Sequence, residues 1–252
     1  MLRICAVTDI GLVREKNQDG FFVNGLSANN TKHKEIYLET DDSNFTALVA
    51  DGVGSTSDGE YAVERLITFF KTQQDLPIDV FLNNINREIY DDALSQKKNA
   101  ATTVAGVIIG EKITVFNVGD SKVFFVNNGY LDQKSTDDTM ENLIIEAGID
   151  SSFLHQSGKS PLTQCIGNSK EMINVHISEI ETENEILICT DGLTDSLELD
   201  EIEAVVKEKA DIRKKMNSLI ELAYKNGCGD NITLIIISFE KEPVNGSQRC
   251  GH

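Results

Sequence analysis

The stretch Leu48-Val49-Ala50-Asp51-Gly52-Val53-Gly54 is an apolar run that ends abruptly at a carboxylate, and a helical pattern begins soon afterwards, near Glu60. It predicts a buried strand that delivers Asp51 to its end, where the two glycines let the backbone turn tightly and approach whatever the carboxylate holds. A buried carboxylate without a partner is costly, and a metal ion is one usual partner. An ordinary Asp-Gly turn is an equally good interpretation of this stretch alone.

The same combination of an apolar run, an aspartate and a neighbouring glycine recurs further along the chain. The recurrences are Gly119-Asp120, Asp191-Gly192 and Gly229-Asp230-Asn231. A fifth carboxylate, Asp19, lies where a strand is expected to begin after a polar loop. If these strands share one core, their ends can meet at one rim, and oxygen ligands of this kind suit Mg²⁺ or Mn²⁺. A cation site and a set of ordinary turns therefore remain as alternatives.

Composition narrows the class of protein. The 252 residues suffice for one large domain or two small ones, and 40% apolar and 25% charged residues are typical of a globular chain. The 41 acidic and 23 basic residues give a net charge of −18, so we expect no nucleic acid and no membrane as partners. No apolar run reaches the ~18 residues that span a bilayer, and the N-terminus does not resemble a signal peptide. We therefore expect a cytoplasmic location.

Periodicity separates the chain into groups of strands and pairs of helices. Strands are expected over residues 2–8, 21–24, 35–39, 45–50, 102–109, 112–118, 121–127, 172–180, 185–189 and 232–239. Helices are expected from residue 60 onward and over residues 77–95, 140–147, 199–209 and 212–225. The three strands between residues 102 and 127 indicate an antiparallel meander, and residues 27–33 a hairpin loop. Because parallel βαβ alternation is absent, we expect antiparallel sheets with helices on their outer faces.

Taken in order, these motifs closely resemble the protein phosphatase 2C family, the metal-dependent serine/threonine phosphatases, in its bacterial form. The matching pieces are Thr8-Asp9-Ile10-Gly11 with Arg14 and Asn17-Gln18-Asp19; Val49-Ala50-Asp51-Gly52-Val53-Gly54 with Gly59-Glu60; Ala101-Thr102-Thr103; Asn117-Val118-Gly119-Asp120-Ser121-Lys122; Leu162-Thr163-Gln164-Cys165-Ile166-Gly167; Ile188-Cys189-Thr190-Asp191-Gly192-Leu193-Thr194-Asp195; and Gly229-Asp230-Asn231-Ile232-Thr233. The resemblance implies an α+β fold, an antiparallel β-sandwich flanked on both faces by helix pairs. It also implies one catalytic domain over residues 1–240 with a flap at about 148–161. The polar tail, 241–252, is expected to be disordered.

The resemblance also implies a site for two Mn²⁺ or Mg²⁺ ions. Asp51 would bridge the ions, and the carbonyl of Gly52 would ligate the second. Asp191 and Asp230 would complete the first, while Asp19 would act mainly through metal-bound waters. A hydroxide that bridges the ions would attack phosphorus, so no cysteine or serine nucleophile is expected.

Two further roles follow from the resemblance. Asp120 together with Asp191 would hold a third, looser ion, and Arg14 would bind the substrate phosphate, because its guanidinium can pair bidentately with phosphate oxygens. The implied activity is hydrolysis of phosphoserine and phosphothreonine on proteins. The implied partners are phosphoprotein substrates and a cognate Ser/Thr kinase, and we expect a monomer.

Some positions depart from the family pattern. Val53 stands where many eukaryotic members have a histidine, so protonation of the leaving group would fall to metal-bound water. Asp138 stands where a histidine is common, and is either part of an acidic rim or an ordinary helix N-terminal residue. His155 falls in the flap, with a structural role favoured over a catalytic one. Two other readings remain: an inactive scaffold of the same fold, and a stress-response phosphatase that acts on anti-sigma-factor antagonists.

Overall fold

The described residues of the computed structural model, 1–72, 76–149 and 159–240, form two antiparallel sheets of six strands each. The first sheet has the order β4 (His33–Thr40), β1 (Leu2–Asp9), β12 (Ile232–Phe239), β11 (Glu185–Cys189), β8 (Lys122–Asn127) and β9 (Tyr130–Gln133). The second has the order β10 (His176–Ile180), β7 (Ile113–Val118), β6 (Thr102–Ile109), β5 (Phe45–Gly52), β2 (Asp19–Val23) and β3 (Leu26–Asn29). The predicted α+β sandwich is confirmed.

The central strands of each sheet are buried on both faces. Successive side chains of a strand point to opposite faces. In β12, Ile235 and Ile237 accordingly join the core between the sheets, whereas Leu234 and Ile236 pack towards the helices on the outside. The central strands contact the other sheet on one face and helices on the other. Because both faces are buried, their sequences are continuous apolar runs rather than alternating ones.

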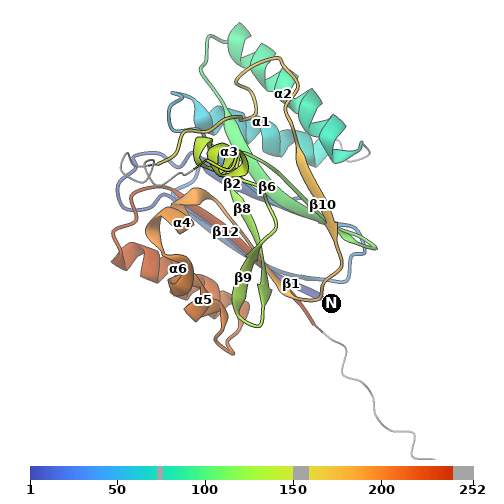
Figure 1. Ribbon diagram of the computed structural model, residues 1–252, viewed down its shortest axis with the longest axis vertical. Helices are drawn as coiled ribbons and strands as arrows, with labels where there is room; N and C mark the ends of the chain where they lie inside the picture. The colour runs from blue at the N-terminus through green and yellow to red at the C-terminus, as the bar shows by residue number, and fades with distance from the viewer. Residues whose placement is uncertain (73–75, 150–158, 241–252) are drawn as a thin grey trace, which may run out of the picture.

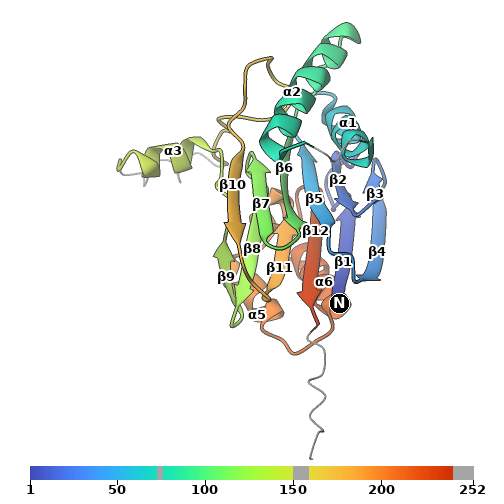
Figure 2. The ribbon, with the colours of Figure 1, turned by 90° about the vertical axis from the view of Figure 1, so that its right-hand side faces the viewer.

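Helices cover the two outer faces, as the paired helical patterns predicted. Helices α1 (Gly59–Thr72) and α2 (Ile78–Ser95) pack on the second sheet, and α4 (Asp191–Ser196), α5 (Leu199–Val206) and α6 (Ile212–Lys225) pack on the first (Figure 1). Helix α3 (Met140–Glu146) buries none of its residues and projects from the sandwich (Figure 2). Within the described ranges, no helix combines the length and the apolar character that crossing a membrane requires.

The predicted meander between residues 102 and 127 is wrong in its last strand. β7 pairs with β6 in the second sheet, but β8 pairs with β11 and β9 in the first. The chain crosses from one sheet to the other at Gly119, whose φ of +102° is accessible mainly to glycine. The crossing places Asp120 between the two sheets.

Three smaller differences concern short elements. Residues 26–29, expected within a loop, form β3 at the sheet edge, and residues 130–133 add β9. Asp191 begins α4, which the sequence analysis did not anticipate because its six residues are too few to show a helical period. The expected disordered tail, 241–252, and His155 lie outside the described residues.

The antiparallel registers bring the predicted carboxylates to one end of the sandwich. In the second sheet, Asp19 lies opposite Asp51, which lies opposite Thr103. In the first sheet, the first residue of β8, Lys122, lies opposite Cys189, the last residue of β11. Asp120, Asp191 and Asp230 therefore follow or precede strands that end at the same rim.

Candidate active site

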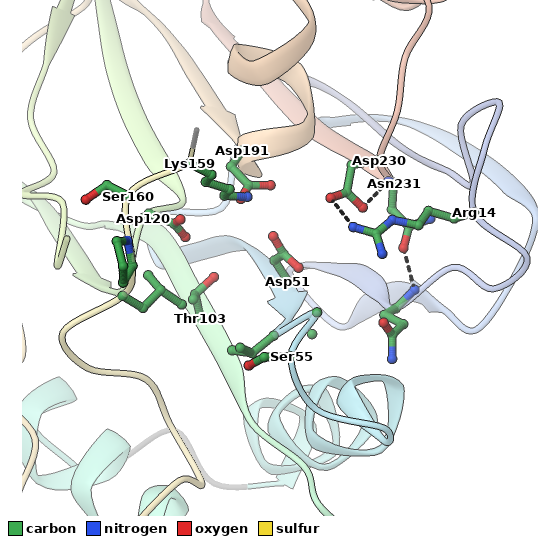
Figure 3. Close-up of a pocket in the computed structure, with 16 residues that line it drawn as sticks. Arg14, Asp51, Ser55, Thr103, Asp120, Lys159, Ser160, Asp191, Asp230 and Asn231 are labelled. Atoms are coloured by element: carbon green, nitrogen blue, oxygen red, sulfur yellow. Dashed lines mark hydrogen bonds and ion pairs between the residues drawn. The ribbon is translucent and has the colours of Figure 1, made fainter. Parts of the chain in front are cut away.

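A cavity of about 330 Å³ opens at this rim (Figure 3). Six of the seven site residues expected from the sequence line it, namely Arg14, Asp51, Gly52, Asp120, Asp191 and Asp230. The seventh, Asp19, is buried behind Asp51 on the neighbouring strand. We refer to Asp19, Asp51, Asp120, Asp191 and Asp230 as the rim carboxylates. They come from five separate parts of the chain, at the ends of strands of both sheets.

Asp19 and Asp51 lie directly opposite each other on β2 and β5. Like charges placed directly opposite each other on neighbouring strands destabilise a sheet. Asp19 is only 1% exposed, and its Oδ2 accepts a hydrogen bond from Thr190 Oγ1 at 2.8 Å. Burial raises the pKa of Asp19 from 3.8 to about 7, although hydrogen bonds from Thr190 and Thr233 oppose this shift. Burial, followed by the charges of Asp19 and Asp120, raises the pKa of Asp51 well above its ordinary value. The fold thus opposes ionisation of both carboxyl groups unless a cation lies close to them.

Asp191 reaches the cavity because α4 begins immediately after β11. A side chain at Gly192 would collide with the carbonyl oxygen of Asn231, so only glycine lets this first helical turn pack on the segment before β12. The Asp191 carboxylate is almost wholly buried, with 8% of its side chain exposed. Its Oδ2 pairs with Lys159, but its Oδ1 is buried and has no hydrogen-bond partner. A buried oxygen of this kind is suited to an ion that the chain itself does not supply.

Gly52 gives Asp51 its position at the end of β5. A Cβ at Gly52 would lie 2.6 Å from the backbone of Gly59, the first residue of α1. The Gly52 N–H donates to the carbonyl of Gln18 at 3.1 Å, which ties β5 to the residue before Asp19. The glycines of the opening motif therefore permit a close backbone approach, as their positions in the sequence predicted.

Asn231 fixes the loop that carries Arg14. Its Oδ1 accepts from the backbone N–H of Gln18 at 2.8 Å, and its Nδ2 donates to the carbonyls of Ile10 and Lys16 at 2.9 and 3.0 Å. One buried amide therefore spans both ends of the loop. The sequence analysis quoted Asn231 within a motif without a role. The only feature of the sequence that could have indicated this role is the residue type, because a side-chain amide can both accept and donate hydrogen bonds.

Arg14 lies on one side of the cavity, opposite Lys159 (Figure 3). Its Nη2 donates to Asp230 Oδ2 at 2.7 Å. That hydrogen bond raises the pKa of Arg14, and the charges of Asp51 and Asp19 act in the same direction. The predicted phosphate-binding arginine is therefore charged, and it faces the same space as the rim carboxylates.

Asp138 is not part of an acidic rim. Its carboxylate is buried, and Oδ2 accepts hydrogen bonds from the Gly119 N–H and from Gln164 Nε2, both at 2.8 Å. Oδ1 pairs with His176 Nε2 at 2.7 Å. The N-cap of α3 is the next residue, Thr139, which accepts from the N–H of Asn142. Asp138 instead holds the turn from which Asp120 projects.

Lys159 occupies the other side of the cavity from Arg14, which the sequence analysis did not foresee. It falls within the range of the predicted flap, 148–161, where no periodicity gives a direction to its side chain. Its Nζ pairs with Asp191 Oδ2 and lies 3.3 Å from Asp195 Oδ2. Burial raises the pKa of Asp120, while the positive charges of Lys159 and Lys122 oppose that shift.

The rim fits hard divalent cations. In the described parts of the chain, no three histidine, cysteine or acidic side chains are already grouped as a metal cluster. Two of the rim carboxylates are instead paired with cationic side chains, Asp230 with Arg14 and Asp191 with Lys159. The donors are carboxylate and carbonyl oxygens, which Mg²⁺ and Mn²⁺ prefer. The unpartnered Asp191 Oδ1 and the opposed Asp19 and Asp51 both favour added positive charge.

Comparisons with known proteins agree with this geometry. The family model for protein phosphatase 2C matches residues 32–223. A putative protein phosphatase 2C-type protein of Streptococcus pyogenes serotype M6 is 27% identical over 260 residues, which cover 96% of this chain and 100% of that protein. The S. agalactiae serine/threonine phosphatase structure has a TM-score of 0.77 at 26% identity, covering 95% of this chain and 100% of that one. The catalytic domain of the phosphatase PstP, solved with two manganese ions, shares the fold with a TM-score of 0.73 at 21% identity, covering 94% and 99%.

Proposed function

The chain belongs to the protein phosphatase 2C family, the metal-dependent serine/threonine protein phosphatases, and we propose that the rim carboxylates and Arg14 are its catalytic site. The observation that carries the assignment is the convergence of these groups in one cavity. Carboxylates that repel one another are costly unless cations are bound between them. Such an array beside the half-exposed guanidinium of Arg14 suits a substrate that is itself an anion.

Mn²⁺ or Mg²⁺, when bound, neutralises the charge of a phosphate monoester and lowers the pKa of water so that a nucleophile is available at neutral pH. Asp51, at the end of β5, would hold both core ions, with the Gly52 carbonyl on the second. Asp191 and Asp230 would hold the first, and Asp19 would support the pair from behind through water. The carboxylates of Asp120 and Asp191 could together hold a third ion.

Arg14 would bind and orient the substrate phosphate. A planar guanidinium pairs bidentately with phosphate oxygens, which a lysine ammonium cannot imitate. The Arg14 side chain is 43% exposed and faces the cavity, so an incoming phosphate can reach it. Asn231 holds its loop in place, which keeps the guanidinium from drifting before the substrate arrives.

Among the described residues that line the cavity there is no histidine and no cysteine. Val53 occupies the place where many eukaryotic members carry a histidine, as noted from the sequence. The described lining therefore offers no side chain of the usual kind for a phosphoenzyme intermediate on cysteine or histidine. This supports direct hydrolysis by water.

The test is a phosphatase assay on purified protein. We expect release of phosphate from p-nitrophenyl phosphate and from a phosphothreonine peptide with Mn²⁺, and loss of activity in EDTA. Asp51→Asn should abolish turnover. The matched control is Asp132→Asn, which should stay active. It removes an exposed carboxylate of β9 that pairs with Lys134 away from the cavity. Full activity without divalent metal, or an active Asp51→Asn enzyme, would overturn the site assignment.

We also propose that the enzyme acts in the cytoplasm as a monomer of one catalytic domain over residues 1–240, opposing a cellular Ser/Thr kinase. A phosphatase needs an enzyme that supplies its phosphorylated substrates. The net charge of −18 supports protein substrates rather than nucleic acid or anionic lipid. Phosphoproteomics of deletion strains for the phosphatase and for a Ser/Thr kinase would test this, since the two sets of changed sites should overlap. Light scattering of the purified protein would test the monomer.

A further inference from the structure

Lys159 is presented to the cavity by a segment whose backbone is anchored. The carbonyl of Pro161 accepts from the N–H of Met140 at 2.8 Å, and Ser160 Oγ accepts from the N–H of Glu141 at 2.9 Å. Leu162 forms a β-bridge with Thr139. The residues directly after Lys159 are therefore fixed to the start of α3, and the position of Lys159 at the rim follows from this attachment.

The ammonium lies among carboxylates on one side of the cavity (Figure 3). It pairs with Asp191 Oδ2 and lies 3.3 Å from Asp195 Oδ2. Burial alone would lower the pKa of Lys159, but the charges of Asp195, Asp120 and Asp51 outweigh burial and raise it. Lys159 is consequently a permanent cation at neutral pH.

The two oxygens of Asp191 have different surroundings. Oδ2 is taken by Lys159, on the side where Asp195 and Asp120 contribute negative charge. Oδ1 is buried without a hydrogen-bond partner. One oxygen therefore stays available to a core ion while the other is already neutralised by the chain itself.

We propose that the Lys159 ammonium takes the place of the third divalent ion beside Asp120 and Asp191, so that this chain binds two ions where its carboxylates could hold three. The inference rests on the proposed metal-dependent phosphatase site. A divalent ion at the third position would have to displace Lys159, because two cations a few ångströms apart repel each other strongly in a partly buried site. The anchored backbone of residues 160–162 keeps Lys159 near the position it would have to leave.

The distinction between Lys159 and Arg14 supports this role. Arg14 pairs with Asp230, while Lys159 pairs with Asp191 at the other side of the cavity. The Lys159 ammonium is a point charge, and it lacks the planar guanidinium group that pairs bidentately with phosphate oxygens. The alternative role, direct binding of the substrate phosphate, predicts a raised KM with an unchanged number of bound ions when Lys159 is replaced.

The experiment counts Mn²⁺ ions bound to metal-stripped protein by electron paramagnetic resonance of the free ion. We compare wild type with Lys159→Gln, which keeps an unbranched polar side chain one atom shorter than lysine and removes the charge, and with Lys159→Arg, which keeps the charge. The matched control is Lys170→Gln, because Lys170 is also paired with an aspartate, Asp91 of α2 at 2.7 Å, but this pair is exposed on the surface away from the cavity. Thermal unfolding checks that each variant folds.

We expect two ions for wild type, Lys170→Gln and Lys159→Arg. Lys159→Gln should bind a third ion at least about tenfold more tightly than wild type does, as expected when about 1.4 kcal/mol of repulsion is removed. Asp120→Asn added to Lys159→Gln should abolish this third ion.

Equal third-ion binding by wild type and Lys159→Gln would overturn the inference. So would the outcome in which only KM changes, which would assign Lys159 to phosphate. In both cases two bound core ions would leave the proposed function intact. Failure of wild type to bind any Mn²⁺ would instead refute the proposed function itself.

Discussion

Replacing Asp19 with asparagine removes one charge from the pair that Asp19 forms with Asp51 across β2 and β5. The amide keeps a carbonyl oxygen that can accept the hydrogen bond from Thr190 Oγ1. Its NH₂ group can also donate towards Asp51, where the wild-type chain has two carboxylates side by side. The substitution therefore changes charge with little change in shape, and we expect it to stabilise the metal-free chain.

The magnitude follows from the pKa of Asp19, which burial raises from 3.8 to about 7. A carboxyl group with a higher pKa in the folded chain binds its proton more tightly when folded, so its contribution to stability is lost as the pH rises from about 4 to about 7. At 1.36 kcal/mol per pH unit, a difference of about three units is an upper bound of about 4 kcal/mol. We expect Asp19→Asn to gain about 2 to 4 kcal/mol at pH 7.5 and about 1 kcal/mol or less at pH 4.5.

The assay is urea unfolding in EDTA at pH 4.5, 6 and 7.5 for wild type, Asp19→Asn and the surface control Asp132→Asn. Because the groups remote from this pair titrate alike in both proteins, the difference between wild type and Asp19→Asn gives the contribution of Asp19 together with its effect on Asp51. In Mn²⁺ at 100 times its Kd for wild type, the advantage of Asp19→Asn should shrink by up to about 2.7 kcal/mol, since the ion stabilises wild type more than a variant that binds it less tightly. A difference that is constant with pH, or an asparagine variant that is less stable in EDTA at pH 7.5, would refute the reasoning.

Three further predictions concern groups around the cavity. Arg14→Lys should raise KM for a phosphothreonine peptide about tenfold or more, because bidentate pairing is lost, while Mn²⁺ binding measured by calorimetry stays unchanged. Asn231→Ala removes three hydrogen bonds and should lower the free energy of unfolding in urea by about 1 to 3 kcal/mol. The kcat/KM should also fall, because the loop that carries Arg14 loosens. An unchanged kcat/KM would count against a positioning role for Asn231. Gly192→Ala should cost about 3 kcal/mol or more, since the methyl group meets the Asn231 carbonyl, and a melting temperature equal to wild type would contradict the close packing of α4.

The sequence predicted the rim carboxylates because each ends or begins a strand beside a glycine. That pattern is local, and it survives in the structure at Asp51-Gly52 and Asp191-Gly192, where the glycines permit backbone contacts that a Cβ would block. The sandwich and its two layers of helices were likewise predictable, since runs that are apolar on both faces require cover on both sides.

Other features depend on long-range pairing that no local pattern encodes. An alternating strand looks the same in either sheet, so the transfer of β8 to the first sheet was not foreseen. The direct opposition of Asp19 and Asp51 depends on the register of β2 and β5, and the role of Asp138 depends on contacts with residues 119, 164 and 176. Lys159 follows a stretch of sequence without periodicity, so no pattern indicates where its side chain points. The structure shows this because the backbone directly after Lys159 is anchored to the start of α3.

The placement of the two cationic side chains explains how the rim can exist before metal binds. Five rim carboxylates, if all ionised, carry five negative charges, and Arg14 and Lys159 compensate two, which leaves three unbalanced. Two divalent ions add four positive charges and turn the rim into a site with one net positive charge, which attracts a phosphate dianion. Metal binding therefore reverses the sign of the field that the substrate meets. The metal-free chain should repel phosphate even though Arg14 is present, so phosphate should protect the protein against thermal unfolding in Mn²⁺ but not in EDTA.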